Sequence, residues 1–176
     1  MDETTRIRML EKVRGEAELL SFPALDRTTA RRIGEAVAAM SEREGLPVTI
    51  AVHLGEQRVF HAAFEGTTAE NDGWVERKRN VVLRSEAPSF EVALTTRLAG
   101  WSPDWLDPRR FAVASGAVPL RVGDLVVGTV ALSGLITSEE ADHEAVMRGI
   151  REYLDPAADA TAAADAEPNQ VRGERS

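Results

Sequence analysis

The sequence predicts an α/β domain in which helices cover both faces of one antiparallel sheet of about five strands, an α/β/α sandwich of three layers. Strand-like segments occur in adjacent pairs and do not alternate with single helices, which disfavours a Rossmann-type parallel sheet. Helical segments flank both pairs. Apolar residues make up 43% of the 176 residues and aromatic residues only 5%, so aliphatic side chains and alanine must fill the core.

Two helices are expected at the start of the chain. Apolar residues recur at steps of three and four within residues 3–20, until Pro23 prevents the helix from continuing. The same spacing predicts a second helix over residues 29–44. Either Thr28 or Thr29 is its expected N-cap, because a hydroxyl can accept a hydrogen bond from a free backbone N–H of the first turn.

A β-hairpin follows the second helix. Residues 48–54 and 57–64 alternate between apolar and polar side chains, and the two residues between them can form a tight turn. This turn makes Ile50 face His61. It therefore places His53 and His61 on opposite faces of the sheet, where they cannot share a metal ion.

The next helix, expected over residues 69–86, carries the one local basic cluster of the chain. Trp74 and Lys78 lie four residues apart and share a face, while Arg77 and Asn80 lie on a neighbouring face. One interpretation is that the cluster captures a carboxylate or a phosphate. The other is a solvated or ion-paired helix surface, because runs of charge are usually surface features.

The second half of the chain repeats the pattern of helices followed by paired strands. Its expected elements are a helix over residues 90–98, a loop over 100–110 with two tryptophans, a short strand over 111–114, strands over 117–122 and 125–133, and a closing helix over 138–154. Thr137 or Ser138 is the expected cap of the closing helix. Residues 155–176 lack apolar periodicity, which predicts a disordered acidic tail after a domain of residues 1–154.

Composition excludes several classes of function. The net charge is -8, and an acidic surface disfavours binding to nucleic acid. The chain has no cysteine, which excludes disulfides, thiolate catalysis and cysteine-ligated metals. No apolar run is long enough for a membrane span, and the first residues lack the apolar core of a signal peptide. We therefore expect a cytoplasmic protein that binds neither membranes nor nucleic acid.

Several short stretches, in this order and spacing, resemble the heme-degrading-domain family, which includes a heme-binding sensor protein and a glycolate-operon protein. The match is closest to the family's branch of small cytoplasmic proteins and covers roughly residues 5–154. The stretches that carry it are Phe22-Pro23, Trp74 with Arg77 to Val82, Gly116 with Pro119, Gly128 with Ser133-Gly134-Leu135, and Asp142-His143 with Tyr153-Leu154.

This resemblance implies a profilin-like α/β/α fold, a homo-oligomer, and binding of heme or another tetrapyrrole. The chain also departs from the family pattern. Relatives in this branch often carry His-Gly-Gly where this chain has Ala114-Ser115-Gly116. If that histidine serves a ligand or a reaction, this chain has lost it.

The predicted ligand-binding residues are Trp74, Arg77, Lys78, Asn80 and His143. His143 belongs to the family motif and can bind a ligand or titrate near neutral pH, although a packing or interface role is the alternative. No catalytic residue and no metal site is assigned, and the cofactor is unknown, with heme as the candidate. The first hypothesis is a module that binds heme, a tetrapyrrole or another small anion. An oligomeric interaction or scaffold protein and a weak enzyme acting on heme or a small metabolite are the alternatives.

Overall fold

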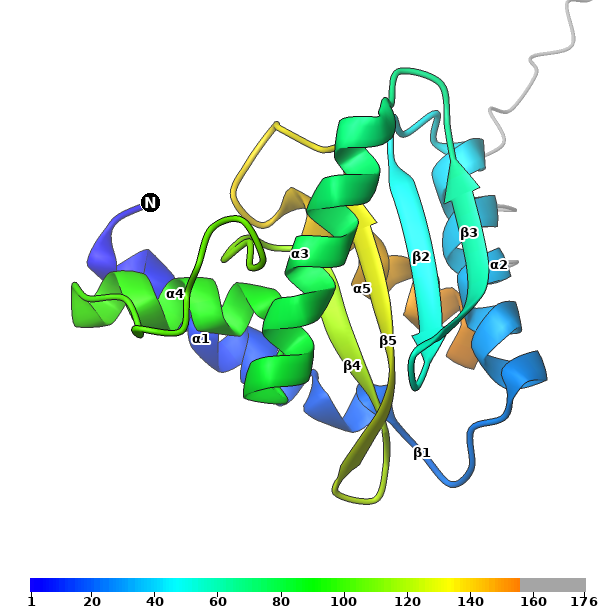
Figure 1. Cartoon of the computed structure of the whole chain (residues 1–176), viewed down its shortest axis with the longest axis horizontal. Helices are drawn as coiled ribbons and strands as arrows, with labels where there is room; N and C mark the ends of the chain where they lie inside the picture. The colour runs from blue at the N-terminus through cyan, green and yellow to red at the C-terminus, as the bar shows by residue number, and fades with distance from the viewer. Residues whose placement is uncertain (156–176) are drawn as a thin grey trace, which may run out of the picture.

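The computed structural model describes residues 1–155; apart from Asp155, the predicted tail over residues 155–176 lies outside the described residues. The elements are, in order, α1 (Glu3–Gly15), a 3₁₀ turn (Ala17–Leu20), β1 (Ser21–Phe22), α2 (Arg27–Arg43), β2 (Thr49–Leu54), β3 (Gln57–Ala63), α3 (Ala69–Ser85), α4 (Ser89–Ala99), β4 (Ala117–Val122), β5 (Leu125–Ser133) and α5 (Ala141–Leu154). Helix α3 crosses one face of the sheet, and α2 and α5 lie behind the other (Figure 1). The predicted α/β sandwich is confirmed.

The sheet has five strands in the order β1-β4-β5-β2-β3. The pairs β4–β5, β5–β2 and β2–β3 are antiparallel, as predicted. The two-residue strand β1 pairs with β4 in parallel, so the sheet is mixed and not wholly antiparallel. A strand of two residues is too short for alternation to reveal it.

The two faces of the sheet carry side chains of different size. Large aliphatic residues face α2 and α5 and form the main core, including Ile50, Val52, Leu120, Val130 and Leu132. Beneath α3 the corresponding positions are alanines, Ala51, Ala117 and Ala131, which pack against Val75 and Val82. The α3 face therefore has little apolar bulk, and polar residues occupy its two ends.

The β2–β3 hairpin contains a bulge that changes its predicted register. His53 pairs with Arg58, but Val52 pairs with Phe60, so Val59 is the extra residue of β3. His61 consequently faces Ala51 and not Ile50. Because Ala51 and His53 lie two residues apart on β2, the two histidines share the α3 face of the sheet, contrary to the prediction.

Several predicted helix boundaries also need correction. Helix α2 begins at Arg27, and its cap is Asp26, whose carboxylate accepts a 2.7 Å hydrogen bond from the Thr29 N–H. Helix α5 begins only at Ala141, with no capping side chain. Residues 138–140 remain in a loop that becomes one wall of the candidate site.

The predicted strand over residues 111–114 is not formed. The backbone N–H of Ala112 donates to the carbonyl of Arg77 on α3, so this segment is held by a helix and has no strand partner.

Helix α1 packs on α4 through a separate small cluster of Val13, Phe90, Ala93 and Leu94. None of the helices within residues 1–155 is long and apolar enough to cross a membrane.

Candidate functional site

A cleft of about 350 Å³ lies between α3, the segment of residues 114–115 and the loop that joins β5 to α5. We call it the α3–α5 cleft. Its polar floor and mostly apolar rim are formed chiefly by Trp74, Lys78, Ser115, Ser133, Ile136 and Asp142. The cleft opens at the end of the α3 face where Thr49 of β2 pairs with Ser133 of β5.

Lys78 is the centre of the floor. Its side chain is 3% exposed, and Nζ lies 2.6 Å from Oδ2 of Asp142, 3.0 Å from Oγ of Ser133 and 3.1 Å from the carbonyl oxygen of Leu132. These three oxygens accept the three ammonium protons. Burial lowers the pKa of Lys78, and the charge and hydrogen bond of Asp142 offset part of that effect. Lys78 therefore acts as a positioning group joining α3, β5 and α5.

Asp142 holds the other side of the floor. Its Oδ1 accepts a 2.8 Å hydrogen bond from the backbone N–H of Leu135, so this carboxylate also fixes the β5–α5 loop. Gly116 makes the arrangement possible, because it has a φ of +112° and a Cβ there would lie 2.7 Å from Cβ of Asp142 and 2.3 Å from the carbonyl oxygen of Leu132. A side chain at this position would displace the floor.

The rim of the cleft is mostly apolar, and the charged side chains that line the cleft form ion pairs with one another. Trp74 forms one side, and Ile136, which is 97% exposed, stands on the opposite loop. Arg97 pairs with Glu139 at 2.6 Å, and Lys78 pairs with Asp142. Each lining cation therefore has an acidic partner that also lines the cleft.

Of the predicted ligand-binding residues, Trp74 and Lys78 lie together in the cleft, whereas Arg77 and Asn80 do not line it. The Arg77 guanidinium lies 4.4 Å from the centre of the Trp74 ring and donates to the carbonyl of Pro108 at 3.4 Å. The Asn80 amide donates to the carbonyl of Arg110 at 2.9 Å. Both residues thus fasten the loop of residues 101–113 to α3.

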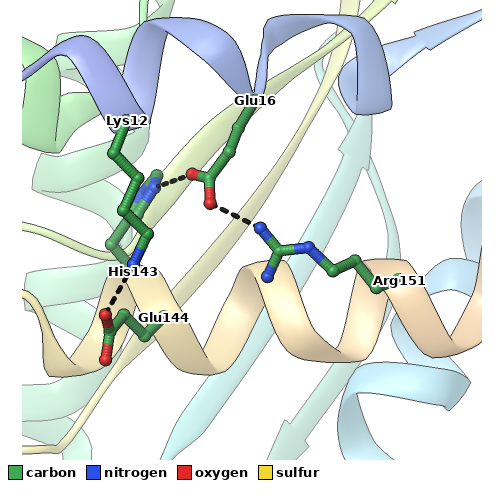
Figure 2. Close-up of polar contacts among 5 residues, drawn as sticks. All are labelled: Lys12, Glu16, His143, Glu144 and Arg151. Carbon is green, nitrogen blue, oxygen red and sulfur yellow. Dashed lines mark hydrogen bonds and ion pairs between the residues drawn. The ribbon is translucent and has the colours of Figure 1, made fainter. Parts of the chain in front are cut away.

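His143 does not line the cleft. Its side chain points toward Glu16 at the end of α1 (Figure 2). It is 1% exposed, and its Nε2 lies 2.8 Å from a carboxylate oxygen of Glu16. Burial raises the pKa of Glu16, but the hydrogen bonds and charges of His143 and Arg151 outweigh it and leave this pKa below its ordinary value. Asp142 and His143 are adjacent in the chain, yet one holds the cleft and the other holds the end of α1.

Sequence reasoning missed Ser115, Ser133 and Asp142 as residues of the site. In the sequence Ser133 and Asp142 stand out only as parts of the family motif, and their contacts with Lys78 span 55 and 64 positions. The available sequence signal for this site was the segment Ala114-Ser115-Gly116, which departs from the His-Gly-Gly expected in relatives. The structure places Ala114, where relatives are expected to carry histidine, in the lining of the cleft.

His53 lies at the opposite end of the α3 face. It pairs across the strands with Thr129, is 4% exposed, and its Nδ1 has no hydrogen-bond partner among the described residues. Burial, followed by the positive charge of Arg79, lowers the pKa of His53 to about 4. The imidazole is therefore neutral at physiological pH.

The residues of the cleft do not fit the iron of heme. Iron in heme is held by histidine, cysteine, methionine or tyrosine, and no residue of these types lines the cleft. Within residues 1–155 there is also no group of three or more histidine, cysteine, aspartate or glutamate side chains placed to hold a metal ion. The cleft can instead offer hydroxyl and amide groups, an indole face and aliphatic side chains.

The sequence of the chain is similar to one protein family and to several individual proteins. The family model described as "Haem degrading protein HbpS-like" matches residues 25–151. A UPF0303 protein of Streptomyces avermitilis is 32% identical over 158 residues, which cover 88% of this chain and 96% of that protein. A UPF0303 protein of Brucella melitensis biotype 2 is 35% identical over 155 residues, covering 85% and 90% respectively.

Solved structures share the fold. Ybr137w superposes with a TM-score of 0.74 at 22% identity, over 87% of this chain and 92% of that one. HbpS gives 0.61 at 22% identity, over 72% and 88%. A complex of PduOC with heme gives 0.57 at 12% identity, over 68% and 88%. At these identities the similarity establishes the architecture alone.

Replacing Lys78 by methionine should destabilise the protein strongly. Lys78→Met leaves the Asp142 carboxylate buried without its cation, which typically costs about 3–5 kcal/mol of unfolding free energy. Urea denaturation of the full chain measures this loss. The double variant Lys78→Met/Asp142→Asn should be more stable than the single variant, because the amide is uncharged and its oxygen still accepts from the Leu135 N–H.

Lys12→Met is the matched control for this experiment. Lys12 pairs with Glu144 at 2.8 Å, but both side chains are 47% exposed. Losing such a surface pair should cost less than about 1 kcal/mol. Equal losses for Lys78→Met and Lys12→Met would contradict the role assigned to the buried pair.

The buried neutral His53 should make stability depend on pH. Below pH 6.5 the unfolded chain protonates this histidine, whereas the folded chain does so only near its pKa of about 4. The unfolding free energy should therefore fall as pH decreases from 6.5 to 4. In His53→Gln this part of the fall should be absent, as measured by urea denaturation at several pH values. Identical slopes in the two proteins would contradict it.

Proposed function

The chain belongs to the HbpS-like family, and we propose that it is a small-molecule-binding module whose ligand occupies the α3–α5 cleft. The observation that carries the proposal is the buried polar floor beneath an open and mostly apolar rim. Lys78, Ser133 and Asp142 are each at least nine-tenths buried, yet all three line the cleft. Binding sites typically combine apolar walls with a few fixed polar groups in this way.

A tetrapyrrole such as heme, or a smaller anion, is the proposed ligand class. The family description and the heme complex of PduOC support the tetrapyrrole. The Trp74 ring, which the Arg77 guanidinium contacts at 4.4 Å, offers a flat surface for a planar ligand. Arg97 at the rim is the lining cation that could exchange its partner Glu139 for a ligand carboxylate, because both side chains are partly exposed.

Self-association is the second part of the proposal. Strand β3 forms an edge of the sheet that has no partner strand among the described residues, and open edges favour pairing with another chain. Large apolar side chains also stand in solvent, including Trp101 and Leu125 at 65% and 71% exposure. These features support a homo-oligomer and agree with an interaction role alongside ligand binding.

Filling part of the cleft should weaken ligand binding. In absorption titrations with hemin, the full chain should show a saturable change. Ala114→Phe, which places a ring in the cleft lining, should weaken binding at least about tenfold, a loss of about 1.4 kcal/mol. Ala17→Phe is the control, because Ala17 is exposed on the 3₁₀ turn outside the cleft.

The same titration distinguishes the two ligand classes. Competition by inorganic phosphate at millimolar concentration would favour the smaller anion. Binding that persists unchanged in Ala114→Phe would place the ligand elsewhere and contradict the proposal. A wild-type chain that shows no saturable change with hemin and no stabilisation by phosphate would contradict it as well.

The proposed self-association predicts a sedimentation mass that is a multiple of the chain mass. Analytical ultracentrifugation of the full chain at micromolar concentration measures it. Leu125→Glu and Trp101→Glu should each reduce the association if their apolar surfaces are buried between copies, because a buried carboxylate without a partner is costly. A wild-type protein that sediments as a monomer would refute this part of the proposal.

A further inference from the structure

None of the three histidines of the chain lines the α3–α5 cleft, and each is either buried or in contact with a carboxylate elsewhere. His53 lies beneath α3 at the hairpin end of the sheet. His61, on the edge strand β3, has its Nε2 2.7 Å from a carboxylate oxygen of Asp72. His143 is buried against Glu16 and the ring of Phe90. None of them can reach a ligand in the cleft without giving up its present surroundings.

The four methionines and the single tyrosine are the other potential iron ligands, and none of them lines the cleft. Met1, at the start of the chain, is 38% exposed. Met40 and Met147 are fully buried in the core on the opposite side of the sheet, and Tyr153 packs against the same core. Met9 packs on the α1–α4 cluster. The chain has no cysteine. A heme in the cleft would therefore receive no axial ligand from these side chains.

The carboxylates of the cleft are also unsuited to a metal ion. Both oxygens of Asp142 accept hydrogen bonds, one from Lys78 and one from the Leu135 N–H. Glu139 is paired with Arg97. A cation would have to displace a buried ammonium or break a rim ion pair to obtain even one of these ligands.

The groups that remain available are hydrogen-bonding and apolar. The Ser115 side chain is nine-tenths buried, lines the cleft and forms no hydrogen bond with any described residue. Asn71 uses its side-chain oxygen to cap α3, which leaves its amide N–H groups for a ligand. Trp74 and Ile136 supply apolar surface on either side.

From this donor set we infer that the cleft recognises the organic ring and polar substituents of its ligand and does not coordinate a metal. The inference rests on the proposed function and specifies it: the ligand is a tetrapyrrole-like molecule whose affinity is independent of a central iron. Ser115 and Asn71 would bind its polar substituents, and Trp74 would pack against its ring.

Parallel titrations of the full chain with hemin and with metal-free protoporphyrin IX test the inference. The two dissociation constants should agree within about threefold, because iron adds no bond to the protein; a difference of that size is about 0.65 kcal/mol. The hemin complex should lack the absorption bands of histidine-ligated iron. Ser115→Ala should weaken both porphyrins by a similar factor.

Ala114→His is the positive control, because it introduces an imidazole into the lining of the cleft. It should strengthen hemin binding at least about tenfold and create the bands of histidine-ligated iron, while protoporphyrin binding stays unchanged. This result would show that the wild-type cleft lacks only the ligand and not the space.

Two outcomes would overturn the inference, and they differ in what they say about the proposed function. If the wild-type chain binds hemin at least tenfold more tightly than protoporphyrin, with bands of axial ligation that His61→Ala or His143→Ala removes, metal coordination is present and the binding function stands. If neither porphyrin binds, the inference and the tetrapyrrole function both fail.

Discussion

The buried ion pair between Lys78 and Asp142 is the interaction on which the candidate site depends. It joins α3 to α5 past the end of β5, and its remaining hydrogen bonds include the Ser133 hydroxyl and the Leu135 N–H. Such a pair gains little net stability over apolar packing, but it is costly to break. Its main consequence is positional, because it defines both the floor of the cleft and the course of the loop above it.

The asymmetry of the sheet explains why the cleft forms on this side. Large aliphatic side chains fill the face toward α2 and α5 and form the main hydrophobic core. The α3 face has alanines at its centre and polar residues at its ends, represented by Ser133 at one end and His53 at the other. A face with little apolar bulk leaves room for ionised and hydroxyl groups, and these give the site its chemistry.

The local spacing of apolar residues predicted most of the helices and strands. The features that it could not predict, the hairpin register and the partners of Lys78, depend on contacts between distant parts of the chain. Hydrophobic spacing located α2, α3 and the hairpin, because each buries a regular stripe. It could not locate the bulge at Val59, which depends on packing against neighbouring strands, and the error reversed the relative facing of His53 and His61.

In the candidate site, the helical spacing of the sequence predicted Trp74 and Lys78, but the partners of Lys78 come from β5 and α5. Arg77 and Asn80 lie on the same helix, but their donors serve backbone carbonyls of a loop outside the cleft.

The opposite directions of two neighbouring side chains on α5 have a mechanical consequence. Asp142 holds the cleft floor, while His143 holds Glu16 at the end of α1, so one helical turn of α5 contacts both the candidate site and the N-terminal helix. Helix α1 otherwise rests on a small apolar cluster and on surface ion pairs. Any displacement of the end of α1 would therefore bear on the turn of α5 that carries Asp142. The N-terminal helix is thus mechanically connected, through α5, to the wall of the cleft.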